Sequence, residues 1–349
     1  MSYYFFTVFT VILFSVLEKK VENKVYKRFF FFLLVLMLIL ISGCRVDSTL
    51  YSDEWNYRQN FTTISQLSFQ ELDLSLTSEP AFTLLNWFLS RFTNDPQILI
   101  FVCSAGINII FVNFLHKYSK NFIFSIFIYI CSGLFFTSMN IIRQYIAMAI
   151  IILGFEHLKN KEIIKYTLYV FIAFLFHKSA IIALIFYFIL NSTFILKHKI
   201  ISFIFIALIL LNFNYILNIF ENSFYSDYVN EFSDSGYGVG IIRILFWSII
   251  YLFILWKSEY LQRKFNIDKI FIKIIFLSFN ILFISSQYVY VARLDYFQIC
   301  SIIIIPLIPY IFKQHNRGII NTGMYSIFFL YGLYLTAGTN MSNLIFTFL

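Results

Sequence analysis

The chain has 349 residues, of which 60% are hydrophobic and 13% are charged, and its formal net charge is +8. Soluble domains average about 45–50% apolar and about 25% charged residues. The composition therefore excludes an ordinary soluble domain and predicts a polytopic membrane protein. The four cysteines are widely spaced and form no Cys-x-x-Cys pair, which argues against a zinc site or a disulfide framework.

Apolar stretches separated by charged residues predict an all-α fold of about twelve transmembrane helices, forming a single membrane domain over residues 1–349. In chain order the stretches cover residues 3–17, 29–44, 97–115, 121–139, 141–157, 162–176, 180–192, 200–217, 241–256, 269–287, 294–312 and 319–336. Several are shorter than the roughly 20 residues that a straight crossing needs, so tilted or buried helices are expected. The apolar piece 80–92 is shorter still and is predicted to be interfacial or re-entrant.

Lysine and arginine assign the loops to two sides of the membrane. Nineteen of the 26 basic residues, accompanied by six acids, fall in alternate loops, which are residues 18–28, 116–120, 156–165, 197–199, 257–273 and 313–317. The positive-inside rule places these loops in the cytoplasm and both chain termini outside.

The opposite, outer side carries arginine where the topology does not require it. Its basic residues are Lys178 and six arginines, namely Arg45, Arg58, Arg91, Arg143, Arg243 and Arg293. Arginine binds phosphate or carboxylate in bidentate fashion. Arg143 and Arg293 lie within apolar stretches, where a charge is costly, so we interpret them as part of a site for an anionic ligand. For Arg58, Arg91 and Arg243, snorkelling to lipid headgroups or pairing with outer acids is the simpler interpretation.

His177 is the one histidine assigned to the outer side, and it lies next to Lys178. An ionisable residue between two apolar segments is by default a functional-site hypothesis. His177 is therefore a candidate general base.

Two outer regions, residues 45–96 and 218–240, mix aromatic, amide and acidic side chains. Aromatic rings stack on sugar faces and carboxylates bind hydroxyls, so both regions are predicted to bind carbohydrate; for 218–240 a solvated acidic surface is the alternative. In the first region Asp53 or Glu79 can accept a proton from a sugar hydroxyl. The expected sugar contacts are Trp55, Tyr57 and Asn86.

Five motifs occur in order over roughly residues 40–310: "SGCRVDSTLYSDEWNYRQNF", "SEPAFTLLNWFLSRF", "NIIRQYIAMAI", "FLFHKSAII" and "ARLDYFQICSIIIIP". Together they resemble the EpsG family of Wzy-like exopolysaccharide and O-antigen polymerases. The resemblance implies the fold of the C-type glycosyltransferase superfamily. It also implies a bacterial inner-membrane enzyme that joins undecaprenyl-pyrophosphate-linked oligosaccharide repeats on the outer face. The site residues implied by matching position are Arg45, Asp53, Tyr57, Glu79, Arg143, Gln144, His177, Arg293 and Tyr296.

A departing pyrophosphate develops negative charge, which preorganised cations stabilise. We expect this clamp to comprise Arg143, Arg293, Arg45, Lys178, Gln144 and Tyr296, and we expect Tyr296 to share a helical face with Arg293. His177 or Asp53 is the expected base, with Glu79 as a further catalytic candidate. No acidic cluster typical of a divalent-metal site is evident, so we expect no metal and no cofactor.

Three other functions are compatible with parts of the pattern: a glycan ligase, a flippase for the same lipid-linked sugar, and a membrane acyltransferase. The chain has only 11 Gly and 4 Pro and no obvious internal repeat, which argues against a transporter built from broken helices. The expected partners are the lipid-linked oligosaccharide and membrane lipid. A chain-length regulator and a flippase of the same pathway are further candidates, and no nucleic-acid partner is expected.

Overall fold

The structure is a computed structural model that describes residues 2–47, 53–76, 79–212, 239–286, 289–338 and 344–346. Its α-helices are α1 (Ser2–Lys20), α2 (Lys24–Gly43), α3 (Asp53–Ser65), α4 (Pro80–Ser90), α5 (Gln97–Tyr118), α6 (Phe122–Cys131), α7 (Leu134–Asn140), α8 (Ile142–Leu153), α9 (Phe155–Lys159), α10 (Ile163–Phe176), α11 (Ile182–Asn191), α12 (Phe194–Lys197), α13 (Lys199–Leu211), α16 (Ile241–Trp256), α17 (Ser258–Phe265), α18 (Lys269–Ile284), α19 (Val289–Ala292), α20 (Gln298–Ile304) and α21 (Arg317–Gly338). Short 3-10 helices are η1 (Phe69–Glu71), η3 (Lys178–Ile181), η4 (Ile305–Ile311) and η5 (Gln314–Asn316). Strands β1 (Arg45–Asp47) and β2 (Leu344–Phe346) form a short antiparallel pair.

Each of the twelve predicted spans overlaps at least one of these helices. Within the described ranges, three helices are long and apolar enough to cross a membrane, and the number reaches five if two bent pairs each count as one span. The bent pairs are α6 with α7, at 47°, and α16 with α17, at 65°. Five further apolar helices are shorter. This is the helix content of a membrane protein, while twelve spans stays a prediction.

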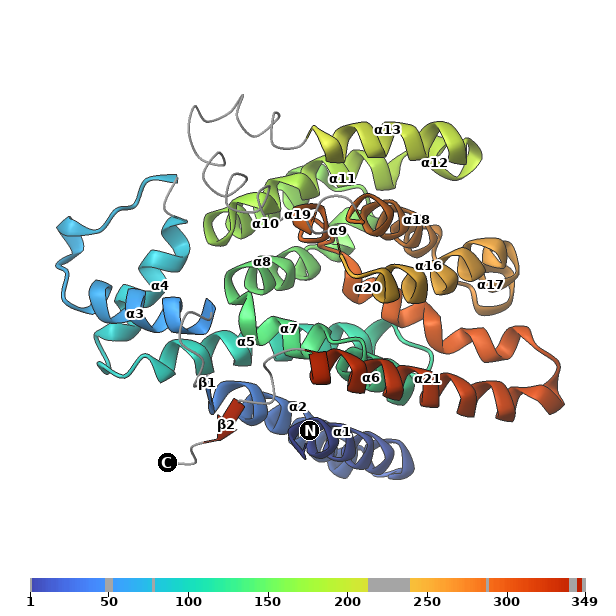
Figure 1. The fold of residues 1–349 in the computed structure, drawn as a ribbon, viewed down its shortest axis with the longest axis horizontal. Helices are drawn as coiled ribbons and strands as arrows, with labels where there is room; N and C mark the ends of the chain where they lie inside the picture. Colours follow the sequence, from blue (N-terminus) through green and yellow to red (C-terminus); the bar gives the residue numbers. More distant parts are fainter. Residues whose placement is uncertain are drawn as a thin grey trace.

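The predicted cytoplasmic loops meet at one end of the helical bundle. His116 lies 3.5 Å from Glu18, Lys117 lies 2.7 Å from Glu156, and ion pairing also joins Lys159 to Asp268 at 3.8 Å. Helix α17 and the turn between α1 and α2 lie at this end, whereas α3 and α4 lie at the opposite end (Figure 1). Loops grouped by charge in the sequence are therefore also grouped in space.

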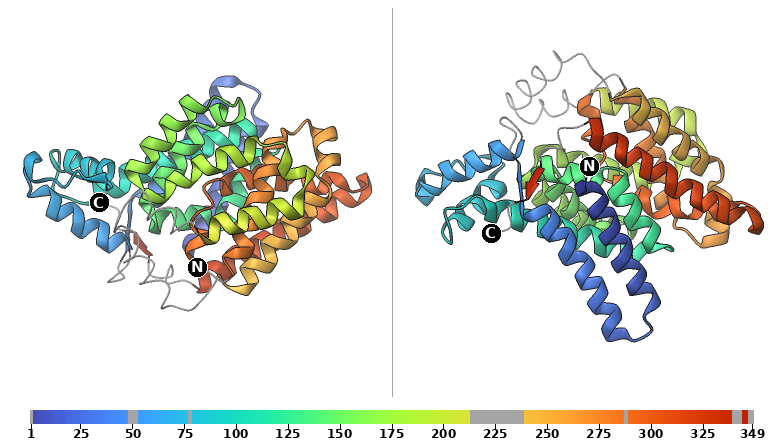
Figure 2. Two further views of the ribbon diagram at one scale, coloured as in Figure 1. Left: turned by 90° about the horizontal axis from the view of Figure 1, so that it is seen from above. Right: turned by 60° about the horizontal axis from the view of Figure 1, so that its bottom comes forward.

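Helices α1 and α2 form a hairpin that packs on α5 and α6. The hairpin projects from the body of the molecule in the right-hand view of Figure 2. Asn23 begins α2, because its side chain accepts a hydrogen bond from the backbone N–H of Val25.

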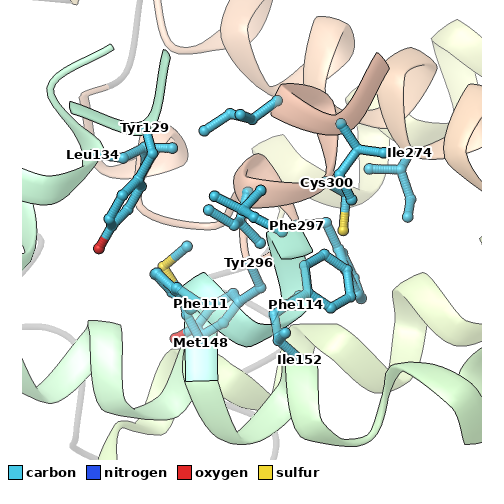
Figure 3. Close-up of a cluster of buried hydrophobic side chains, with 14 of the residues drawn as sticks. Phe111, Phe114, Tyr129, Leu134, Met148, Ile152, Ile274, Tyr296, Phe297 and Cys300 are labelled. Carbon is cyan, nitrogen blue, oxygen red and sulfur yellow. The ribbon is translucent and has the colours of Figure 1, made fainter. Parts of the chain in front are cut away.

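The main core joins helices that are distant in the sequence. Phe111 and Phe114 of α5 and Met148 of α8 lie near Phe297 and Cys300 at the start of α20 (Figure 3). Lipid tails are as apolar as these side chains, so van der Waals packing is the main gain from bringing the helices together.

A smaller cluster fastens the outer helices α3 and α4 onto α5 and the start of α8. Its buried members are Tyr57, Phe61, Phe82, Leu89, Leu99, Ile100, Cys103 and Ile142. This packing fixes the first residues of α3, α4 and α8 relative to one another, and those residues include Asp53, Pro80 and Arg143. Of the other predicted sugar-binding region, only residues 239 and 240 lie within the described ranges.

Candidate active site

Glu79 is the residue around which several predicted site residues assemble. Its carboxylate accepts a hydrogen bond from Nη1 of Arg143 at 2.6 Å and lies 2.8 Å from Nδ1 of His177. The backbone N–H of Lys178 donates to the same carboxylate at 3.3 Å. The Glu79 side chain is only 8% exposed. An arginine and a histidine that are far apart in the sequence thus share one buried carboxylate, and we call Glu79, Arg143 and His177 the Glu79 cluster.

The charge of Glu79 fixes the hydrogen-bonding role of His177. Burial alone would raise the pKa of Glu79, but the charge and hydrogen bond of His177 and the charge of Arg143 together lower it to about 2. The ionised carboxylate only accepts hydrogen bonds, so Nδ1 of His177 carries the hydrogen and donates it. In the neutral imidazole Nε2 is then the proton acceptor. Nε2 makes no hydrogen bond to any residue that the structure describes.

The backbone of Glu79 is strained. Its φ is 55° and its ψ is 65°, in the left-handed region, and it is followed by Pro80, which begins α4. A residue before proline favours extended backbone, and a non-glycine residue in the left-handed region is disfavoured by about 1–3 kcal/mol. Such strain at an ion-paired carboxylate is typical of a functional site.

Arg143 lies in the first turn of α8, after a break at Ile141 that separates α8 from α7. Its guanidinium carbon is 5.5 Å from the ring centroid of Tyr57 and 5.8 Å from that of Phe82, within the range of cation–π attraction. The side chain is nevertheless 39% exposed. The two rings therefore orient a guanidinium that remains accessible to a ligand.

Asp53, the first residue of α3, lies within electrostatic range of both Arg293 and Arg143. Burial raises the pKa of Asp53 above its ordinary value, and the two arginines oppose that rise. One turn further along α3, burial raises the pKa of Tyr57 to about 12, so its phenol stays neutral. Asp53, Tyr57 and Arg293 thus lie near the Glu79 cluster, while their shared role in one site stays a prediction.

Gln144 and Tyr296 are buried behind these residues. The side-chain amide of Gln144 donates to the backbone carbonyl of Arg293 at 2.6 Å, and the hydroxyls of Tyr296 and Ser179 lie 2.7 Å apart. Each contact holds a neighbour of the Glu79 cluster in place. Sequence reasoning did not single out Ser179, although it lies in the same "FHKSA" motif as His177.

The expectation that Arg293 and Tyr296 share a helical face is wrong. Helix α19 ends at Ala292 and α20 begins only at Gln298. Between them the Asp295 side chain accepts from the backbone N–H of Phe297 at 3.3 Å and from Ser278 at 3.1 Å. A short aspartate side chain that bonds the backbone two residues on competes with helix formation, which explains the break.

Arg45 lies apart from the Glu79 cluster and is fully buried, with 1% of its side chain exposed. Its Nε lies 2.9 Å from Glu54, and its other nitrogens donate to the carbonyls of Ser42 and Met139 and to the Ser104 hydroxyl. The guanidinium therefore binds protein groups and fixes the start of α3.

Glu54 and Gln97 complete this supporting network and were not identified from the sequence. Arg58 pairs with Glu54 at 2.8 Å and donates to the Gln97 side chain at 2.7 Å. The four-residue spacing of Glu54 and Arg58 on one helix was the available signal.

The remaining predicted site residues, Lys178, Trp55 and Asn86, differ in their contacts and in their exposure. Lys178 contributes its backbone N–H to Glu79, and its charge acts on Asp73. Trp55 on α3 is exposed, whereas Asn86 on α4 is fully buried and donates to the Phe82 carbonyl of its own helix. A sugar contact for Asn86 stays a prediction. Across the described ranges, no three His, Cys, Asp or Glu side chains are grouped to hold a metal ion.

The arrangement combines an accessible guanidinium, a second arginine nearby and an imidazole oriented by a carboxylate. The model of the EpsG family matches residues 28–347, which contain all of these groups. The chain belongs to the EpsG family. This is the family of Wzy-like exopolysaccharide polymerases, so the resemblance seen in the five motifs is confirmed. Comparison of this EpsG chain with curated proteins and with solved structures gave no significant match.

Proposed function

We propose that this chain is a glycosyltransferase that joins undecaprenyl-pyrophosphate-linked oligosaccharide repeats into a surface polysaccharide, at the outer face of the bacterial cytoplasmic membrane. The observation that carries the proposal is the Glu79 cluster, in which one carboxylate orients both a cation and an imidazole. Membership of the EpsG family supports a polysaccharide polymerase.

The leaving group is a pyrophosphate, whose negative charge grows as its bond to the sugar breaks. Arg143 is exposed enough to bind it, and Arg293 is held nearby through the bond between Gln144 and its carbonyl. Guanidinium groups fixed before the reaction stabilise developing charge without reorganising. We assign Arg143 and Arg293 to the pyrophosphate, with the side chain of Lys178 as a third cation.

The acceptor hydroxyl requires a base, and the geometry favours His177. The hydroxyl oxygen of the acceptor sugar attacks the anomeric carbon of the donor sugar. The bond from that carbon to the pyrophosphate oxygen breaks, and the bonding electrons leave with undecaprenyl pyrophosphate. The hydroxyl proton passes to Nε2 of His177, and the ionised Glu79 stabilises the resulting imidazolium. We assign Asp53, which lies within electrostatic range of both arginines, to bind sugar hydroxyls.

The outward orientation is supported by the opposite end of the bundle. The lysine-rich loops lie there, and the positive-inside rule assigns them to the cytoplasm. The Glu79 cluster and α3 and α4 then face outward, where lipid-linked repeats are joined.

Deleting the gene and sizing the surface glycan tests the proposed function. Loss of long chains with single repeats retained is expected. Retention of long chains would contradict a polymerase, and loss of all repeats from the outer face would indicate a flippase instead. Complementation with Arg143→Lys, which keeps the charge but loses the planar fork, is expected to restore only short chains.

A further inference from the structure

A polar cavity distinct from the Glu79 cluster lies next to the start of α20. Two residues near the start of α20 lie in different places. Arg293 lies near Asp53 and Arg143, whereas Gln298, the first residue of α20, lines the cavity. Arg243, in the first turn of α16, lines it as well. We call it the Arg243 cavity.

The Arg243 cavity has a volume of about 130 Å³, many times the roughly 10–15 Å³ that one water molecule needs. Its polar lining includes Ser132, Thr137, Tyr145, Arg243 and Gln298, and no carboxylate of the described residues lines it. One wall is the break between α6 and α7, where Gly133 adopts a φ of 84° that other residues rarely take.

Arg243 has unused hydrogen-bonding capacity. Its guanidinium makes no hydrogen bond or salt bridge to any residue within the described ranges, and the side-chain amide of Gln298 makes none either. Arg243 also lines a smaller neighbouring pocket together with Asp295, whose carboxylate accepts hydrogen bonds from the Ser278 hydroxyl and the backbone N–H of Phe297. A partly buried cation beside a carboxylate-free cavity favours a ligand that carries an oxyanion.

The flanking helices favour a lipid as the carrier of that oxyanion. Helices α16 and α21 pack together, with the rings of Phe246 and Tyr331 stacked at 4.0 Å. Each helix also has exposed apolar side chains, such as Leu245 and Ile249 on α16 and Leu330 on α21. Because both helices are predicted spans, these side chains face the bilayer. A polyprenyl chain can therefore lie along them while its phosphate enters the Arg243 cavity.

We infer that the Arg243 cavity binds the pyrophosphate of a second polyprenyl-linked oligosaccharide, the one that keeps its lipid while the Glu79 cluster binds the one that loses it. The inference rests on the proposed function, because joining two lipid-linked substrates requires two lipid pyrophosphate sites. Arg243 and Gln298 bind the retained pyrophosphate and leave its bond to the sugar intact.

Binding stoichiometry tests the inference. The full chain in nanodiscs is titrated with farnesyl pyrophosphate, and bound molecules are counted by native mass spectrometry. We expect two molecules on the wild type, one on Arg243→Gln and one on Arg143→Gln. The control Arg263→Gln, which changes an exposed arginine at the opposite end, should bind two. Two molecules on Arg243→Gln would overturn the inference.

Two further measurements test whether the guanidinium shape matters at Arg243 and whether the cavity prefers a polyprenyl pyrophosphate to a phospholipid. Arg243→Lys keeps the charge and should bind the second molecule roughly tenfold or more weakly. Binding with wild-type affinity would show that bidentate binding by the Arg243 guanidinium is not needed. Displacement of farnesyl pyrophosphate from the Arg243 cavity by phosphatidylglycerol would show a general phospholipid site and also overturn the inference. Loss of long glycan on gene deletion, together with two molecules on Arg243→Gln, would refute the inference alone, whereas long glycan after deletion would refute the proposed function.

Discussion

The two ends of the bundle both carry many charges, but they use them differently. At the lysine-rich end, Lys117 and Glu156 are paired while their side chains are 58% and 39% exposed. At the other end, Glu79 is 8% exposed and His177 only 15%. Exposed pairs contribute about 0–1 kcal/mol, whereas removing one partner of a buried pair costs about 3–5 kcal/mol. The comparison shows that the paired charges at the lysine-rich end stay exposed to solvent, while Glu79 and His177 at the other end are largely buried.

The largest expected effect is at the centre of the site. Glu79→Gln removes the charge that orients His177 and Arg143, so we expect the polymerisation rate to fall by about 10²–10⁴-fold. The rate is measured with purified protein and lipid-linked repeats. The matched control is Glu71→Gln, which changes an exposed acid of the same outer region and should leave the rate unchanged. Equal rates for both variants would remove Glu79 from the mechanism.

Arg45→Met is expected to have the next largest effect, on stability. It removes one ion-pair partner of the buried Glu54 carboxylate and keeps the pair with Arg58, so we expect a loss near the lower end of the range, about 3 kcal/mol. Thermal unfolding in detergent measures the change, with the exposed Arg263→Met as control. A melting temperature equal to that of the wild type would show that the Arg45 network does not hold α3.

Lowering the pH should reduce the stability that the Glu79 cluster contributes. Because the pKa of Glu79 is lowered from 4.5 to about 2, the stability it contributes is present above pH about 4.5 and is lost as the pH falls toward about 2. The melting temperature of the wild type should therefore fall over this window, relative to that of Glu79→Gln. Parallel curves for the two proteins would argue against the shifted pKa.

The smallest effect is expected at the lysine-rich end. Lys117→Ala removes an exposed pair with Glu156 and should change the free energy of unfolding by less than about 1 kcal/mol. Glycan length should not change. A shortened glycan in cells with a wild-type amount of protein would contradict the division of roles between the two ends.

Much of the fold was predictable because apolar stretches and alternating charge are local signals. Helices were found at every predicted span, and the lysine-rich loops lie together as the charge pattern requires. The points at which helices are interrupted were harder to predict from the sequence. The interruption between α19 and α20 depends on one aspartate that bonds its own backbone, within a stretch that is otherwise apolar.

The residues of the candidate site could be singled out from the sequence, but the contacts between them could not. Glu79, Arg143 and His177 could be singled out by residue type and motif, yet nothing in the sequence joins positions 64 and 98 residues apart. Arg45 and Arg143 look alike as outer arginines. Only burial separates them, and burial is set by the packing of α2, α3 and α5 around Arg45.

The most direct test of the central claim is the rate of repeat joining by His177→Asn in purified form. The asparagine amide can take the place of Nδ1 and still donate to Glu79, but the proton acceptor at Nε2 is lost. We predict a folded protein that leaves lipid-linked repeats unjoined, while the wild type produces a ladder of longer chains. A wild-type ladder from His177→Asn would contradict the assignment of His177 as the base.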